Sequence, residues 1–233
     1  MEQPDVDARH YIADENGQIR LKVRSLTDSR GYLTGEDVYL YRGVDDKRWR
    51  ELEPVTIDGV VREEFFPIAV DAGRNVLYGY DEINGYDAVM EVPLDGSNQG
   101  SVLIARNDVD VDHLIRIGRQ RRVVGASYAT EKRNIQYFDD ELGKLAGDLA
   151  KALPDQPLVT IAGASADENR LLIIASGDRD PGMVYLYDKT ARRLEPLLAM
   201  REALVGRAMG AVTPINYPAA DGTQIPGYLT LPP

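Results

Sequence analysis

The sequence contains no cysteine and only two histidines, His10 and His113, among its 233 residues. Without cysteine there is no disulfide framework, no thiolate metal site and no cysteine nucleophile. Any serine–histidine–acid arrangement would have to use one of the two histidines as its base. These absences leave few kinds of catalytic site open to the chain.

Long apolar runs and an excess of basic residues are also missing. No stretch approaches the roughly 18 consecutive apolar residues of a membrane span, and the first residues lack the basic-then-apolar pattern of a signal peptide. The 27 Lys and Arg residues stand against 38 Asp and Glu, a net charge of −11. Such a charge repels phosphate backbones and anionic lipid surfaces. We therefore expect a soluble protein that binds neither nucleic acid nor a membrane.

A strand-rich pattern recurs four times along the chain. Each copy reads as an apolar strand, a loop, a second strand, an acidic turn and a short third strand. The equivalent positions on the second strand are Val38, Val89, Ile135 and Val184, separated by 51, 46 and 49 residues. The acidic turns are Asp45–Asp46, Asp95–Gly96, Asp139–Asp140 and Asp188–Lys189. A strand-rich repeat near this length is typical of propeller blades.

One segment breaks the strand pattern. Leu142, Leu145, Leu149 and Leu153 recur at helical spacing, and the pattern ends at Pro154. We interpret this segment as an amphipathic surface helix inserted at the rim of the third blade. The predicted fold is therefore all-β, a partial β-propeller of about four antiparallel blades with one inserted surface helix.

Two serines deserve comparison with the nucleophile elbow G-x-S-x-G. Ser127 lies in GASYA and Ser165 in GASAD. Both motifs lack the second glycine, and neither is followed by the helix that the elbow requires. His10 in DARHYIAD and His113 in VDVDHLIRI are not beside a recognisable nucleophile. We expect structural roles for both serines.

Three acidic motifs could be mistaken for sites. The segment 107–112 alternates carboxylates like a calcium loop, but His113 and Arg119 stand where that loop needs glycine and an acid; an edge strand with inward valines and solvated aspartates is favoured. Glu63–Glu64 could hold an ammonium group, although an exposed turn is the simpler interpretation. Residues 178–182, DRDPG, are expected to form a loop between strands. We assign no catalytic, cofactor-binding or metal-binding residue, and no cofactor.

The amino-acid sequence nevertheless resembles that of a known protein family. NRLLIIASGDRDPGMVYLYDKTARRLEPLL and IQYFDDELGKLAGDLAKALPDQ are similar to the propeller of the prolyl oligopeptidase family of serine peptidases, and most of all to its bacterial acylaminoacyl-peptidase and dipeptidyl-peptidase-like branch. TPINYPAADGTQIPGYLTLPP is similar to the segment, Asp-Gly-x-x-Ile-x-Gly-Tyr-Leu, by which such chains enter the α/β-hydrolase domain. The resemblance covers residues 10–233.

The resemblance implies a partial propeller domain over residues 1–212 and an exit segment over residues 213–233 that leads toward an absent α/β-hydrolase domain. In the family the nucleophile serine, the aspartate and the histidine all follow this segment, so no catalytic residue is carried over. Glu63–Glu64 lacks the setting of the family's amine-binding glutamates. The implied parent cleaves aminoacyl or acyl-aminoacyl bonds of short peptides, with the propeller gating access, while this portion alone would be inactive.

Other interpretations remain open from the sequence. A stand-alone propeller could serve as a scaffold for protein partners, whereas a hydrolase with a metal on the propeller axis would need clustered ligands that we do not find. Because a partial propeller exposes apolar faces and strand edges, we expect a homo-oligomer, with two open arcs completing a ring. The compartment, bacterial cytoplasm or periplasm, is left open.

Overall fold

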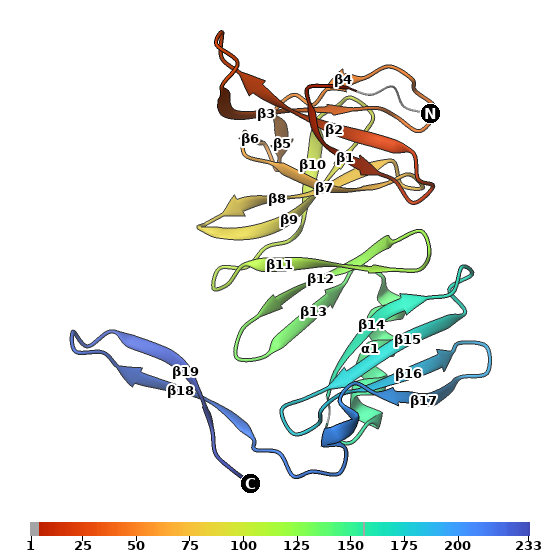
Figure 1. The fold of residues 1–233 in the computed structure, drawn as a ribbon, viewed down its shortest axis with the longest axis vertical. Coiled ribbons are helices and arrows are strands. Elements are labelled where there is room, and N and C mark those ends of the chain that lie inside the picture. Colours follow the sequence, from red (N-terminus) through yellow and green to blue (C-terminus); the bar gives the residue numbers. More distant parts are fainter. Residues whose placement is uncertain (1–4, 156) are drawn as a thin grey trace.

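The strands of the chain form a series of separate sheets. The structure is a computed structural model that describes residues 5–155 and 157–233. Four antiparallel sheets, called blades 1 to 4 below, follow one another along the molecule, and a two-stranded hairpin projects beyond them (Figure 1). This is a partial β-propeller of four blades with one long helix, as the repeat predicts.

The blades differ in how they are completed. Blade 1 contains β1 (Ala8–Ala13), β2 (Ile19–Thr27), β3 (Leu33–Tyr41) and the short β4 (Arg50–Glu51). Blade 2 contains β7 (Phe66–Asp71), β8 (Val76–Ile83), β9 (Tyr86–Pro93) and β10 (Gln99–Ile104). An extra hairpin, β5 (Val55–Ile57) and β6 (Val60–Arg62), adds to blade 2 because β5 pairs in parallel with β10.

The second half of the chain follows the same order. Blade 3 contains β11 (Val111–Ile117), β12 (Arg122–Ala129) and β13 (Arg133–Tyr137), followed by helix α1 (Asp140–Ala152). Blade 4 contains β14 (Leu158–Ala164), β15 (Arg170–Ser176), β16 (Met183–Asp188) and β17 (Arg193–Ala199). A 3₁₀ turn, η1 (Glu202–Leu204), then leads to β18 (Val212–Pro218) and β19 (Gln224–Thr230).

The repeat predicted from the sequence is in register with the blades. Val38, Val89, Ile135 and Val184 lie on β3, β9, β13 and β16, the third strand of each blade. Each blade opens on a strand that the predicted unit lacks, namely β1, β7, β11 or β14. The predicted count of three strands is therefore too low for blades 1, 2 and 4, whereas blade 3 has three strands because a helix replaces its last one. These opening strands pair with the next strand across a tight turn, so they belong to the blade that they precede.

Helix α1 stands where blade 3 would have its fourth strand. The predicted acidic turn at Asp139–Asp140 is instead the start of this helix, since the Asp139 side chain caps it by accepting a hydrogen bond from the Leu142 N–H. Leu142 and Leu149 are buried on its inner face, against blade 4. Within the described residues, no helix has both the length and the apolar character needed to cross a membrane.

The hydrophobic core is divided among the spaces between blades. Leu21 and Val23 of β2 pack with Leu77 and Met90 of blade 2, while other clusters join blade 2 to blade 3 and blade 3 to blade 4. Alternate residues of each strand face opposite neighbours, which is why one strand can contribute to two interfaces. The predicted boundary between residues 212 and 213 stays a prediction, and residues 1–4 and 156 of the first predicted domain lie outside the described part.

Candidate functional site

The structure brings a serine, a histidine and an aspartate, the three residue types of a catalytic triad, together in blade 3. His113 of β11 and Ser127 of β12 are paired across the two strands, and Asp112 lies beside them. The Ser127 hydroxyl donates to Asp112 Oδ1 over 2.7 Å, and His113 Nδ1 is 3.1 Å from the same oxygen. Arg133 Nη1 lies 3.0 Å from Ser127 Oγ and 2.7 Å from Asp112 Oδ2.

The order of these contacts does not fit a serine–histidine–acid relay. A relay places histidine between the serine and the acid, so that the imidazole can take the hydroxyl proton. Here the hydroxyl donates directly to the carboxylate, Ser127 is buried, and the His113 side chain is 74% exposed. We interpret the cluster as a polar network that links β11, β12 and β13.

The charge state of Asp112 supports that interpretation. Burial alone would raise the pKa of its carboxyl, but hydrogen bonds from Ser127, Arg133 and His113 outweigh burial and lower the pKa below 3.8. A carboxylate held ionised in this way is a weak proton acceptor. The two groups that contact the Ser127 hydroxyl, the Asp112 carboxylate and the Arg133 guanidinium, are therefore poor general bases.

The other predicted residues lie apart from this cluster. His10 is exposed on β1 and lines a hollow of about 370 Å³ with Asp37 and Phe66. Ser165 belongs to the β14–β15 turn, where its hydroxyl donates to Asp167 over 2.6 Å and accepts from the Arg170 N–H. Neither of these two contacts of Ser165 is with a histidine that could take the proton of its hydroxyl.

The aspartates of the segment 107–112 each bind a different protein group. In the segment 107–112 only the last two residues are in a strand, so the predicted edge strand is wrong for most of it. Asp108 pairs with Arg106, Asp110 accepts the Asp87 N–H, and Asp112 belongs to the blade 3 cluster. Because each carboxylate has its own protein partner, they do not converge. Within the described residues there is no grouping of His, Asp or Glu that could hold a metal ion.

The remaining motifs behave as turns. Glu63 and Glu64 are both exposed between β6 and β7, and of the two only Glu63 lines a small hollow, of about 140 Å³, with Glu51 and Glu53. Residues 178–182 form the loop between β15 and β16, as predicted. The Asp178 carboxylate accepts the Val212 N–H over 2.8 Å and so ties this loop to the start of β18.

The feature that the blades do not explain is the hairpin β18–β19, called the arm below. Its strands pair only with each other and extend away from the blades (Figure 1). The Tyr228 hydroxyl lies 3.0 Å from the Thr130 carbonyl oxygen and 2.9 Å from that of Glu131, at the β12–β13 turn. This hydroxyl, which can donate to either oxygen, holds the arm against blade 3.

Much of the arm is apolar and uncovered. Its exposed apolar side chains are Val212, Tyr217, Ile225, Tyr228 and Leu229, with Leu231 just beyond them. An isolated two-stranded hairpin is only marginally stable in water, because it has no third strand or helix to cover its apolar face. The arm is therefore built like an element that packs against something further.

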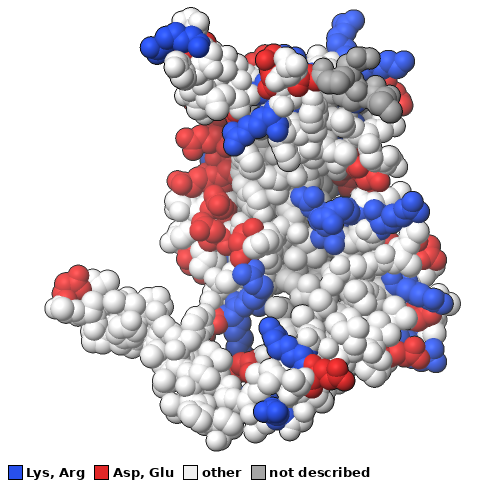
Figure 2. All heavy atoms as spheres, viewed as in Figure 1, with Lys and Arg blue, Asp and Glu red and all other residues white. Residues whose placement is uncertain are grey.

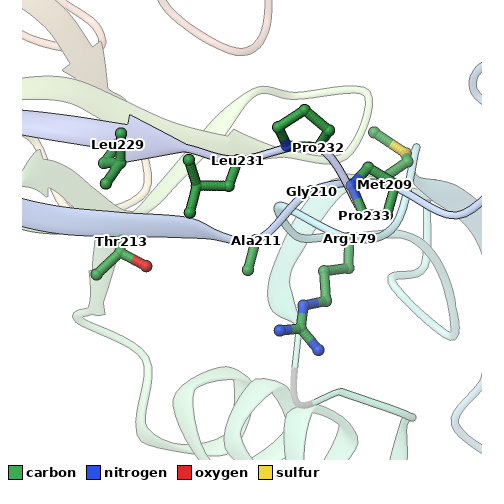
Figure 3. A pocket seen from close by; sticks show the side chains of 9 residues that line it. All are labelled: Arg179, Met209, Gly210, Ala211, Thr213, Leu229, Leu231, Pro232 and Pro233. Carbon is green, nitrogen blue, oxygen red and sulfur yellow. The ribbon is translucent and has the colours of Figure 1, made fainter.

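Two hollows mark the places where the arm meets the blades. The first, of about 380 Å³, lies at the base of the arm, where Leu229 and Leu231 approach Arg179 and the chain end (Figure 3). The second, of about 500 Å³, lies between the arm and blades 3 and 4, with Tyr228 and Val212 on one wall and Arg133 and Ser176 on the other. This seam is the best candidate for a functional region in the chain.

Comparison with known proteins identifies the fold. No family model and no curated protein matches the sequence. Prolyl oligopeptidase B from Galerina marginata, bound to a 25-residue macrocyclization substrate, is similar with a TM-score of 0.53 and 16% identity over 92% of this chain. Its complex with a 35-residue substrate gives a TM-score of 0.51 and 15% identity, also over 92% of this chain. A puromycin-hydrolyzing peptidase from Mycobacterium tuberculosis gives 0.46 and 13% identity, over 95% of this chain and 42% of its own.

What is shared is the fold. The chain spans 29% of the length of each prolyl oligopeptidase B chain, and at this identity the likeness concerns only the arrangement of strands. It agrees with the four blades described above, and it leaves the chemistry of any site to be argued separately.

Proposed function

We propose that the chain is the non-catalytic propeller portion of a serine-type peptidase, and that the arm leads into a further α/β-hydrolase domain. The observation that carries the proposal is the arm, a hairpin that contacts the blades through Tyr228 and Val212 and whose apolar side chains are largely exposed. The fold likeness to prolyl oligopeptidase B over 92% of the chain supports it.

In the whole protein the blades would restrict access to the catalytic domain. A wall of packed sheets beside a hydrolase site admits short or extended peptides and excludes folded proteins on size alone. The sequence resemblance favours cleavage of aminoacyl or acyl-aminoacyl bonds through an acyl-enzyme intermediate. The seam between the arm and blades 3 and 4 would then form part of the boundary between the two domains.

The first test concerns the coding sequence. We expect the reading frame to continue past Pro233 into a segment that contains G-x-S-x-G and, later, an aspartate and a histidine. A stop codon directly after Pro233 in the genomic sequence would contradict the proposal and favour the alternative, a stand-alone scaffold for protein partners.

The second test concerns activity. Residues 1–233 alone should not hydrolyse aminoacyl or acyl-aminoacyl chromogenic substrates, whereas the full-length protein should, with loss on treatment with a serine-directed inhibitor. In the full-length protein, Tyr228→Phe removes the hydroxyl that anchors the arm and should lower kcat/KM. Tyr217→Phe is the matched control on the same hairpin. Inhibitor-sensitive hydrolysis by residues 1–233 would overturn the proposal.

A further inference from the structure

A further hollow lies on the rim of the blades opposite the arm. It has a volume of about 210 Å³ and is bounded by the β1–β2 turn, by β7 and by the β11–β12 turn. It lies at the start of β12, whereas the arm contacts the turn after the end of that strand, 8 residues on. At about 3.3 Å per residue, the two places are about 26 Å apart along the strand.

Basic side chains gather at this hollow. Arg116, Arg119 and Arg121 all line it, and a group of basic side chains is visible on this side of the molecule (Figure 2). The concentration is unexpected in a chain with a net charge of −11, in which carboxylates outnumber basic groups. The positive charges of neighbouring arginines repel one another, and an anion bound beside them would offset that repulsion.

These arginines lack the partners that their neighbours have. In the part of the chain that the structure describes, none of the three forms an ion pair, and Arg116 donates only to the Ile68 carbonyl over 3.2 Å. The adjacent Arg122, in contrast, pairs with both Glu168 and Asp139. Burial lowers the pKa of Arg116, and the positive charge of Arg121 lowers it further.

Two carboxylates also line the hollow, but other groups occupy them. Asp14 accepts from the N–H groups of Asn16 and Gln18 and pairs with Arg20. Glu15 accepts from the backbone N–H groups of the β7–β8 turn over 2.9 and 3.0 Å. Because these oxygens already have donors, the guanidinium groups of the β11–β12 turn remain available to a ligand.

The backbone conformation of Arg121 recurs in the equivalent turns of other blades. Arg121 has a φ of 54°, in the left-handed region that disfavours a side chain such as arginine. Its N–H bonds to the carbonyl three residues earlier, as does that of Gly17 in the equivalent turn of blade 1, where φ is 76°. Blade 1 has glycine at this position, whereas blade 3 has Arg121 and blade 4 has Glu168, which has the same φ of 54° and donates its N–H to the Ser165 carbonyl. The turn therefore accepts a charged side chain in two of the blades.

We propose that this hollow binds a small oxyanion of the phosphate class, either inorganic phosphate or the phosphate group of a small metabolite. Guanidinium groups present paired donors that match phosphate oxygens, and a dianion neutralises several arginines at once. A monoanionic carboxylate would be attracted less strongly, because it carries one negative charge where a phosphate dianion carries two. The proposal is independent of the peptidase proposal, since it concerns the opposite rim.

The test is isothermal titration calorimetry, in which inorganic phosphate is added to residues 1–233 in a non-phosphate buffer at constant ionic strength. We expect saturable binding, with sodium acetate giving none. Glycerol 3-phosphate, in a separate titration, distinguishes a phosphate monoester from the free ion by which of the two binds more tightly. The absence of saturable phosphate binding, or equal binding of acetate, would overturn the proposal.

Arg121→Asn is the decisive variant. Asparagine tolerates a left-handed φ, so the fold should be retained while one guanidinium is lost. We expect phosphate to bind about tenfold more weakly, the loss of one charge-assisted hydrogen bond, with an unchanged circular dichroism spectrum. Arg119→Gln should weaken binding similarly, and Arg207→Gln, an exposed arginine outside the hollow, should not. Undiminished binding by both hollow variants would contradict the assignment.

Discussion

The two ends of the arc of blades are finished in different ways. On the outer face of blade 1, Asp5 forms ion pairs with Lys22 and Arg24 over 2.6 and 2.8 Å. The Lys22 ammonium and the Arg42 guanidinium both lie over the Trp49 ring, 4.7 and 4.5 Å from its centroid. Lys22 is only 6% exposed, so the residues of blade 1 itself cover this face.

The outer face of blade 4 has no such cover. Leu171 and Ile173 of β15 point toward blade 3 and are fully buried. The alternate positions point the other way, and strand pairing places Leu172 and Ile174 beside Leu186, Val184 and Leu198 on one face. None of these five belongs to a hydrophobic cluster, and Leu172 and Leu198 are 36% and 58% exposed.

Blade 1 is therefore the sealed end of the arc, because its own residues cover its outer face. Blade 4 is the open end, because its outer face is apolar and partly exposed. The aliphatic face of blade 4 is the kind of surface that blades 1 to 3 each bury against the next blade. Two arcs that closed head to tail would press this face against the ionic layer of blade 1, where desolvating the charges costs free energy. We therefore expect two copies of the chain to associate through their blade 4 faces. The predicted ring of two arcs is untested, and the chemical difference between the two outer faces disfavours it.

The largest effect should come from Arg20, where blade 1 meets blade 2. Its side chain is fully buried, and it donates to Asp14, Asn75 and the Arg42 carbonyl. Arg20→Ala leaves the Asp14 carboxylate buried without its cation, so we expect the free energy of unfolding to fall by about 3–5 kcal/mol. Chemical denaturation followed by circular dichroism measures the change.

Arg24→Ala is the control for Arg20→Ala. The Arg24 side chain is 41% exposed and shares Asp5 with Lys22, so its removal should cost less than about 1 kcal/mol. Equal destabilisation by the two variants would show that burial of charge does not determine the stability of this end.

Leu171 and Leu172 compare the two faces of blade 4 directly. Leu171→Ala should destabilise the chain by about 2–5 kcal/mol, because it opens a cavity between blades 3 and 4. Leu172→Ala, one residue along the same strand, should cost about 0.5 kcal/mol, because its side chain is partly in solvent. Denaturant midpoints of the two variants measure this difference, and a similar loss from both would mean that the outer face is covered in solution.

Local patterns in the sequence predict the blades well. The alternation of apolar residues and the turn signals place Val38, Val89, Ile135 and Val184 on equivalent strands. The leucine spacing predicts the helix, which spans Asp140–Ala152. Each of these signals lies within a few residues, where backbone preferences and side-chain alternation act.

Contacts between distant segments could not be predicted in the same way. Asp112 meets Ser127 only because of the β11–β12 register and an irregularity in it between Val111 and His113. The arginine hollow combines turns from separate blades, and the arm is held by a hydroxyl and a carbonyl 98 residues apart. Such distances follow from how sheets stack, about which a single sequence carries no local signal.

Acid should weaken the sealed end at blade 1 through protonation of Asp5. Hydrogen bonds from Lys22 and then Arg24 lower the pKa of Asp5 to about 2, from a usual value of 3.8. A depressed carboxyl pKa stabilises the fold above the unfolded value and loses that contribution as the pH falls from about 4 to 2.

Asp5→Asn removes this dependence. The unfolding midpoints of the original chain and the variant should differ at pH 6 and converge between pH 4 and pH 2. Thermal unfolding at a series of pH values measures both. A gap that stays constant down to pH 2 would mean that the ion pairs of Asp5 are not formed in solution.

A small change in stability, and the most direct test of the open end, should come from Leu172→Lys. A lysine there can extend its charge into solvent, so the free energy of unfolding of the monomer should change by less than about 1 kcal/mol. Association, however, would bury that charge against an apolar partner, and this costs free energy. Light scattering over a range of concentrations should therefore show association in the original chain and a shift toward monomer in the variant. Val60→Lys, on the exposed hairpin of blade 2, is the matched control and should leave association unchanged. If the original chain is already monomeric at every concentration, or if both lysine variants act alike, the aliphatic face of blade 4 is not where copies of this chain meet.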